Sequence, residues 1–296
     1  TSAVSNTVTV DGTAPTVVLS STDGDGFVRD GQANVTITAT FTEANGLSGT
    51  PTISIPTASD PVTAQAMSGA GLVWTYSWNV PAGDETVSVS ISATDNAGNA
   101  NAAPTGQTSF TIDNMAPSAP SVPNLDDASD SNINSDDVTN DNTPTFTVTG
   151  TNGLLLEILD GGAVVASVTA DGTAQQLTTS VLADGTNKSI TARTTDAAGN
   201  TTSSSALLVT IDTSNPSTPT TPDLTTDSGS SSTDNITNDN TPDFSVTGTL
   251  NHKLEILVGG STVVATVASA SGSSQSLTAS TLSDASYSVT ARTTDL

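Results

Sequence analysis

The sequence predicts an all-β protein built as a tandem array of about three modules, and three observations lead to this prediction. The chain repeats itself about every hundred residues, with Asp-Asn-Thr-Pro at 141–144 and 239–242 and Leu-Glu-Ile-Leu-x-Gly-Gly at 156–162 and 254–260. Self-similarity at a fixed period of this size is typical of repeat architectures. Aromatic residues make up only 3% of the chain, while Thr, Ser, Val and Ala abound, a composition that favours many short strands.

Alternating side chains locate individual strands. At 35–41, 74–78 and 87–93, apolar residues alternate mainly with Thr or Ser, the pattern of a half-buried antiparallel strand. Two Gly-Gly pairs, at 161–162 and 259–260, separate apolar runs and predict hairpin turns. In the second repeat, short apolar runs predict strands at 146–148, 154–159, 164–168, 190–192 and 207–211.

About seven short strands per hundred residues predict an immunoglobulin-like β-sandwich for each repeat. A hydrophobic run that ends in Asp recurs at 10–11, 112–113 and 211–212 and marks the boundaries. We therefore expect the last strand of a preceding repeat at 1–10, module one at 11–112, module two at 113–211, and module three at 212–296, truncated before its last strand.

The charge balance limits the kinds of partner that the chain can bind. Thirty acidic residues face five basic ones, for a net charge of −25, so nucleic acid is excluded because no phosphate-neutralising patch can form. No apolar stretch approaches the roughly 20 residues of a membrane span, and we expect no membrane insertion. The chain has no cysteine, so disulfides cannot stabilise these modules.

Carboxylates are predicted to gather where modules meet. Thr-Asp-x-Ala-Gly-Asn, at 94–99 and 195–200, is expected to form a loop beside the incoming linker. At the first junction Asp11 and Asp95 can meet Glu43, whose loop shares their pole. Carboxylates within ~4–6 Å repel one another, and no lysine or arginine is available nearby in sequence, so a divalent cation is the natural compensator.

Oxygen ligands without cysteine or histidine select calcium over zinc or copper. The competing interpretation is that Asp, Asn and Gly merely form turns and that acidity maintains solubility. We take calcium as the cofactor. The candidate ligands are Asp11, Asp23, Asp25, Asp30, Glu43, Asp95, Asp113, Asp130, Asp136, Asp196, Asp212, Asp227, Asp234 and Asp295.

The Asp-x-x-x-Pro linkers, the motif Asp-Asn-x-Thr-Asn-Asp-Asn-Thr-Pro at 234–242 and the Thr-Asp-x-Ala-Gly-Asn loops resemble bacterial Ig-like extender repeats. Such repeats occur in large RTX-type, type I-secreted adhesins and biofilm-associated proteins. The resemblance implies an extracellular stalk on a Gram-negative cell, stiffened by calcium, whose other parts contact the host or biofilm surface. It also implies linker ligands Asp11, Asp113 and Asp212 and loop partners Asp95, Asp196 and Asp295.

Two other function classes compete with the stalk. An enzyme is not expected, because there is no thiol and His252, the only histidine, is expected to be a surface residue in a turn. The alternative to the stalk is a lectin-like module that binds glycan or protein directly. Trp74, Tyr76 and Trp78 lie on one face of a strand and offer an aromatic platform, unless they fill the core of module one.

The expected partners include neighbouring repeats of the same chain. In addition, residues 1–10 of one molecule are predicted to donate a strand, head to tail, to the open sheet edge of module three in another.

Overall fold

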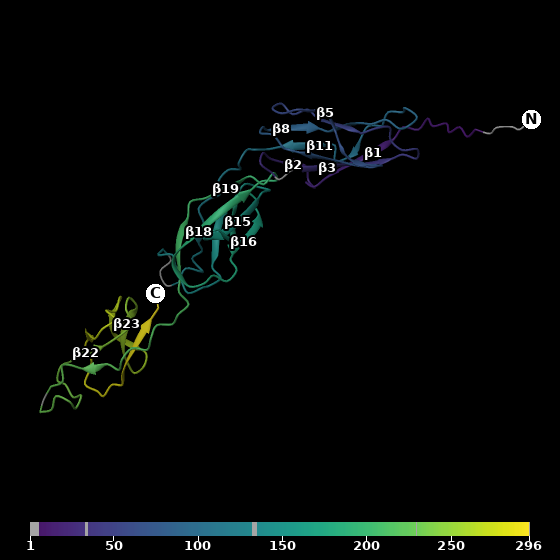
Figure 1. The fold of residues 1–296 in the computed structure, drawn as a ribbon. Helices are drawn as coiled ribbons and strands as arrows, with labels where there is room; N and C mark the ends of the chain where they lie inside the picture. Colours follow the sequence, from purple (N-terminus) through teal and green to yellow (C-terminus); the bar gives the residue numbers. More distant parts are fainter. Residues whose placement is uncertain (1–5, 33–34, 132–134, 229, 296) are drawn as a thin grey trace, which may run out of the picture.

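The computed structural model describes residues 6–32, 35–131, 135–228 and 230–295. Three lobes follow one another along the chain (Figure 1). In the described ranges regular structure consists of β-strands, and no helix is long and apolar enough to cross a bilayer. The all-β prediction is therefore confirmed.

Module one contains three sheets, ordered β10-β1-β3-β7-β6, β2-β11-β8 and β5-β4-β9. Its longest strand, β3, alternates buried and more exposed side chains as predicted. The strands are β1 (Thr16–Ser21), β2 (Phe27–Val28), β3 (Val35–Thr42), β4 (Thr52–Ile55), β5 (Val62–Ala66), β6 (Ser68–Ala70), β7 (Val73–Trp78), β8 (Glu85–Ser88), β9 (Ser90–Ser92), β10 (Thr105–Gly106) and β11 (Ser109–Ile112).

Module two contains two sheets, ordered β12-β14-β17 and β13-β20-β18-β15-β16, with β19 added to β18. The predicted hairpin at Gly161–Gly162 joins β15 to β16, and both glycines have positive φ, 55° and 93°, which only glycine adopts freely. The strands are β12 (Asn124–Leu125), β13 (Val138–Thr139), β14 (Thr145–Thr149), β15 (Leu155–Asp160), β16 (Ala163–Thr169), β17 (Ala174–Thr178), β18 (Gly185–Thr195), β19 (Thr201–Ser203) and β20 (Leu207–Ile211).

Module three repeats this plan in the sheets β21-β22-β25 and β24-β23-β26. Strand β26 lies at the edge of its sheet in the described residues, whereas its counterpart β18 lies between β15 and β20. The strands are β21 (Asp223–Leu224), β22 (Asp243–Val246), β23 (Lys253–Val258), β24 (Thr262–Val267), β25 (Gln275–Thr278) and β26 (Val289–Thr294).

Each module has its own hydrophobic core. In module one Trp78 is 1% exposed and packs against Phe110, with ring centroids 5.3 Å apart. Trp74 and Tyr76 are partly buried against the same core. The aromatic set thus belongs to the core of module one, which removes the platform that the lectin-like alternative requires.

Two strand predictions need correction. Residues 87–93 were expected to form one strand, but β8 pairs with β11 and β9 pairs with β4. The chain changes sheets at Val89, and alternation continues because inward positions of both sheets face one core. Residues 6–10 form no strand, and Val8 and Val10 are exposed. Residues 1–5 lie outside the described residues, so strand donation by 1–10 stays a prediction.

Candidate metal sites at the module junctions

The Thr-Asp-x-Ala-Gly-Asn loop of module one is organised by Asp95. Its Oδ1 accepts hydrogen bonds from the backbone N–H groups of Ala97 (2.9 Å) and Asn99 (2.8 Å). Gly98 has φ +94°, which allows the tight turn. The Asn99 Nδ2 donates to Asp95 Oδ2 (2.8 Å) and to the backbone oxygen of Asp11 (3.2 Å). The loop therefore holds the incoming linker.

Module two uses the same arrangement. Asn200 donates its backbone N–H to Asp196 Oδ1 (2.8 Å) and its Nδ2 to Asp196 Oδ2 (3.0 Å). The same Nδ2 lies 2.9 Å from the backbone oxygen of Asp113. The recurrence explains the motif: Asp orders its own turn, Gly permits it, and Asn ties it to the linker.

The linker aspartates are also anchored to the module that they leave. The Asp113 N–H donates to Val28 O (2.9 Å) and the Asp212 N–H donates to Thr139 O (2.9 Å). Asp113 and Asp212 thus have their backbones bonded to the module that precedes the junction.

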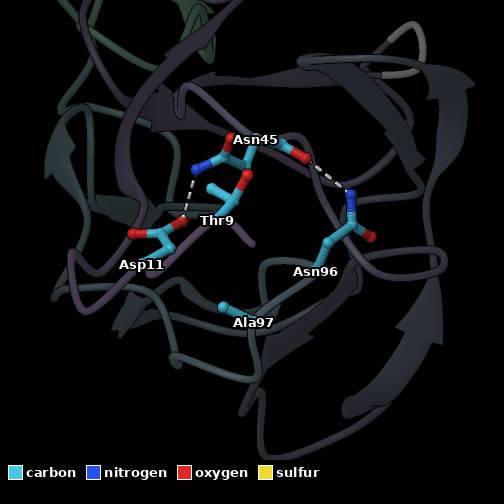
Figure 2. Close-up of a pocket in the computed structure, with 5 residues that line it drawn as sticks. All are labelled: Thr9, Asp11, Asn45, Asn96 and Ala97. Atoms are coloured by element: carbon cyan, nitrogen blue, oxygen red, sulfur yellow. Dashed lines mark hydrogen bonds between the residues drawn. The ribbon is translucent and has the colours of Figure 1, made fainter. Parts of the chain in front are cut away.

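At the N-terminal junction, three carboxylates come together as predicted. Asp11, Glu43 and Asp95 each offer an oxygen, and these atoms lie within 4.8 Å of one another; we call them the N-terminal cluster. Asp95 is fully buried. Figure 2 shows the adjoining shallow pocket, where the Asn45 Nδ2 donates to Asp11 Oδ2 (2.8 Å).

Two opposing effects set the pKa of Asp95. Burial raises it, but hydrogen bonds from the Asn99 side chain and from the backbone N–H groups of Asn99, Ala97 and Gly98 outweigh burial and leave the pKa below its ordinary value. The Asp95 carboxylate is therefore held in the ionised form that a metal ligand requires.

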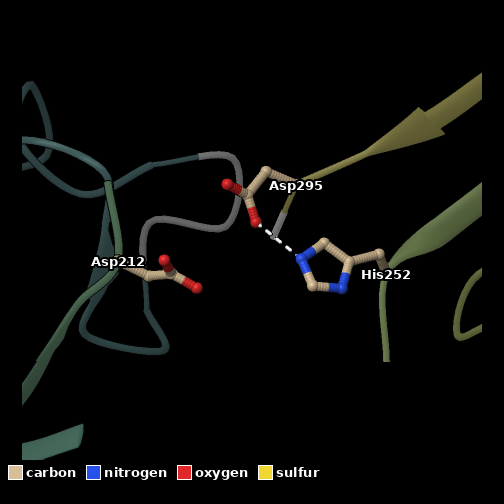
Figure 3. A group of neighbouring side chains, drawn as sticks. All are labelled: Asp212, His252 and Asp295. Carbon is tan, nitrogen blue, oxygen red and sulfur yellow. Dashed lines mark ion pairs between the residues drawn. The ribbon is translucent and has the colours of Figure 1, made fainter. Parts of the chain in front are cut away.

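At the junction between modules two and three, the cluster contains a histidine. The ligand atoms of Asp212, His252 and Asp295 lie within 4.8 Å of one another; we call them the C-terminal cluster (Figure 3). His252 Nε2 is 3.0 Å from Asp295 Oδ1, and the histidine side chain is only 16% exposed. The histidine expected at the surface is thus partly covered. His252 stands just before the recurrent Leu-Glu-Ile-Leu segment at 254–257. This position in the repeat could have been used to predict that His252 lies opposite Thr294-Asp295.

At the middle junction the structure supplies a basic residue. A Cβ added at Gly199 would lie 3.6 Å from Arg29 Nε, so Arg29 of module one lies against the Asp196 loop of module two. Arg29 and Gly199 belong to different modules, so their separation in the sequence gave no sign of this contact.

The remaining candidates of module one take part in turns. Asp23 accepts hydrogen bonds from the Gly26 N–H (2.9 Å) and the Gln32 Nε2 (3.0 Å), and Asp25 accepts one from the Phe27 N–H (3.0 Å). The Asp30 N–H donates to Asn114 Oδ1 (2.7 Å). Within the described residues, none of these aspartates joins a group of three potential ligands.

The acidic loop of module two concentrates negative charge around a buried carboxylate. Asp130 is 7% exposed, and its Oδ1 has no hydrogen-bond partner among the residues that the structure describes. Burial raises the pKa of Asp130, and the charges of Asp136 and Asp137 raise it further. In module three the corresponding Asp227 Oδ1 is also buried, with no hydrogen-bond partner in the described part of the chain. Asp234 Oδ1 accepts a hydrogen bond from the Ile236 N–H (3.2 Å).

The fold and its junctions define a chain of Ig-like β-sandwich modules with acidic poles. Residues 116–213 and 215–296, more than half of the chain, match the bacterial Ig-like domain family, and the chain belongs to this family. No curated protein matches the sequence.

Three solved structures illustrate the similarity. A 1.5-MDa bacterial ice-binding adhesin is 18% identical over 89% of this chain and 86% of its own, with a TM-score of 0.34. The Clostridium thermocellum CbhA fibronectin(III)-like modules are 13% identical over 66% and 94%, with a TM-score of 0.40. The BSP domain of a biofilm-associated protein is 10% identical over 96% and 64%, with a TM-score of 0.23. We draw no functional argument from likenesses at this level.

Proposed function

We propose that this chain is an extender segment of a bacterial cell-surface adhesin, in which calcium at the acidic poles holds successive Ig-like modules in line. The proposal is supported by the tandem arrangement and by membership of the bacterial Ig-like domain family. The stalk separates the cell from an adhesive region elsewhere in the protein, which contacts a host or biofilm surface.

The observation that carries the proposal is the N-terminal cluster. Its oxygens come from a linker, Asp11, and from two loops of the next module, Glu43 and Asp95. Calcium accepts six to eight oxygen ligands in a tolerant geometry, so the three carboxylates with backbone oxygens and water form a suitable set. A dication also relieves the repulsion between them.

The acidic loops supply a second kind of candidate calcium site, within a module. A buried carboxylate oxygen without a partner, as on Asp130, is costly unless something compensates it. Asp136 lies close enough to raise the pKa of Asp130, so a cation between the two carboxylates would be attracted by both negative charges. The corresponding aspartates of module three, Asp227 and Asp234, are the equivalent candidates.

Calcium at a junction acts mechanically. A metal ion held by a linker and the next module removes rotation about the linker. Strands of eight to ten residues give a module about 30–40 Å long, so three modules in line span on the order of 100 Å. Extracellular calcium sites have Kd values of roughly 10⁻⁴–10⁻³ M, so the stalk stiffens outside the cell and stays loose within it.

This calcium dependence suits export by type I secretion and display on a Gram-negative cell, as RTX-type adhesins do. Loose modules pass more easily through a narrow channel, and external calcium then stiffens them. The absence of cysteine agrees with a stalk that relies on metal rather than disulfides.

Small-angle X-ray scattering of the whole chain, with and without millimolar calcium, tests the proposal. We expect calcium to lengthen the maximum dimension and to raise the melting temperature. Glu43→Gln removes a ligand charge without disturbing the loop that Asp95 organises, and it should weaken calcium binding at the N-terminal cluster about tenfold. Ser59→Ala, far from any cluster, is the control. Identical scattering curves in calcium and in chelator would overturn the stalk mechanism.

A further inference from the structure

The C-terminal cluster is chemically unlike the N-terminal one. Asp212 follows β20 and is bonded through its N–H to module two, whereas His252 precedes β23 and Asp295 follows β26 in module three. The three side chains therefore join two modules across their junction, with a nitrogen facing two carboxylates (Figure 3).

Strand register explains why His252 occupies this position. Lys253 pairs with Thr294, so the next position along the ladder sets His252 opposite Asp295. In module two Leu155 pairs with Thr195, which places Leu154 opposite Asp196. In module one Leu47 bridges Asp95 directly. The position opposite the loop aspartate is thus leucine in two modules and histidine in the third.

The orientation of the imidazole ring favours a metal ligand. His252 Nδ1 is 2.8 Å from the backbone oxygen of Leu250, and a carbonyl oxygen can face only a protonated nitrogen. In the neutral ring Nε2 then carries its lone pair toward Asp295. Fixing one ring nitrogen on a backbone carbonyl while the other binds a metal is the usual arrangement of metal-ligating histidines.

The spacing also fits. His252 Nε2 and Asp295 Oδ1 lie 3.0 Å apart. Zinc bonds of about 2.05 Å at the tetrahedral angle separate two ligand atoms by about 3.3 Å, so a shift of a few tenths of an ångström accommodates the ion. Two carboxylates with a neutral imidazole balance the charge of one dication.

We infer that Asp212, His252 and Asp295 form a site for a transition-metal dication of the zinc class, with water in the remaining coordination positions. Imidazole suits zinc and its neighbours, whereas calcium prefers a set made only of oxygens. The ion ties the end of module two to module three. This inference stands on His252 and is independent of calcium at the other junctions.

The experiment uses the single histidine of the chain as its probe. Because His252 is the only histidine, the imidazole ring resonances of the whole chain report this site alone. With ZnCl2 at neutral pH, we expect them to shift and saturate at one equivalent, whereas millimolar CaCl2 leaves them in place. Chelator should reverse the shift.

Matched variants localise the ion. His252→Leu installs the residue type that the other two modules carry, so it should fold, and calorimetry should show zinc affinity reduced at least tenfold. Asp212→Asn should weaken zinc binding to a similar extent if the ion bridges the junction. Ser59→Ala, in module one and outside both clusters, should leave zinc binding unchanged.

Three results would overturn the inference. The first is an imidazole that responds to pH but not to zinc, which identifies a simple ion pair with Asp295. The second is undiminished zinc binding in His252→Leu, and the third is undiminished binding in Asp212→Asn. None of these outcomes depends on whether calcium straightens the chain.

Discussion

Modules two and three are near-copies that differ at their entrance. Both pair an arginine with a buried glutamate across neighbouring strands, Arg193 with Glu157 and Arg292 with Glu255. At the start of the strand that carries the glutamate, the preceding residue and the first strand residue change from Leu154-Leu155 to His252-Lys253. Module three therefore gains an imidazole at the junction and a second cation beside its buried glutamate.

This difference teaches that core and junction vary separately. The alternating positions and the glutamate are fixed by packing within the module, so they recur unchanged. The residue opposite the loop aspartate faces the neighbouring module, so it can change without disturbing the core. Junction chemistry can thus be altered one residue at a time on a constant scaffold.

The largest expected contrast concerns the buried glutamates. Arg193→Ala leaves Glu157 without its partner, at a cost of about 2–3 kcal/mol to module two, because a buried charge loses its hydrogen bonds. Arg292→Ala should cost about 1 kcal/mol, because Lys253 Nζ remains 2.6 Å from Glu255 Oε1. Amide hydrogen exchange in β15 and β23 measures the loss of stability in module two and in module three. Equal losses of stability in the two variants would contradict this account.

A graft tests whether the junction position alone confers metal binding. Leu154→His should give module two an imidazole opposite Asp196 and create a second, weaker zinc site with Asp113. Because Arg29 lies against this loop, its positive charge should reduce the zinc affinity of the new site. Adding Arg29→Gln should raise that affinity about tenfold, or by about 1.4 kcal/mol. The new imidazole resonance reports occupancy. Its indifference to zinc in both variants would mean that the linker geometry also matters.

The smallest expected effect concerns the acidic loops, where module two has Asp137 and module three has Asn235. Burial and the charge of Asp136 raise the pKa of Asp137, and the pKa of Asp130 is raised too. These groups bind protons more readily in the folded state. Metal-free module two should therefore gain stability as the pH falls from neutral through their raised pKa values toward the ordinary 3.8.

Asp137→Asn should reduce that gain and raise the metal-free melting temperature by a few degrees. Hydrogen bonds from Thr173 lower the pKa of Asp171, so protonation of Asp171 reduces the stability of module two, but only below pH 3.8. The pH range of this loss is therefore separate from the pH range of the gain. Melting curves in chelator across this pH range measure the effect. A melting temperature of module two that does not change with Asp137→Asn at neutral pH would count against charge crowding in the loop.

Local patterns in the sequence were enough to predict most of the fold. Alternation located β3 and β7, and paired glycines located the hairpins, because these signals lie within a few neighbouring residues. Continuous alternation could not reveal the change of sheet at Val89, since inward positions look alike in either sheet. The meeting of Asp11, Glu43 and Asp95 followed from the order of loops around a sandwich.

The other junctions depended on information that no single segment carries. Arg29 reaches the Asp196 loop from a different module, and nothing in its own surroundings indicates that contact. His252 became visible only through the pairing of β23 with β26. Asp23 and Asp25 turned inward to their own loop, where short-range hydrogen bonds from backbone N–H groups compete successfully with a more distant pole.

The short parallel pairs β2–β11 and β13–β20 have a mechanical consequence. In each, a strand near the entrance of a module lies beside the strand by which the chain leaves it. Traction on the two ends draws such neighbours past each other lengthwise, so their hydrogen bonds must break together rather than one after another. A chain pulled at its ends would therefore meet resistance at these few backbone bonds, next to the linkers that begin at Asp113 and Asp212.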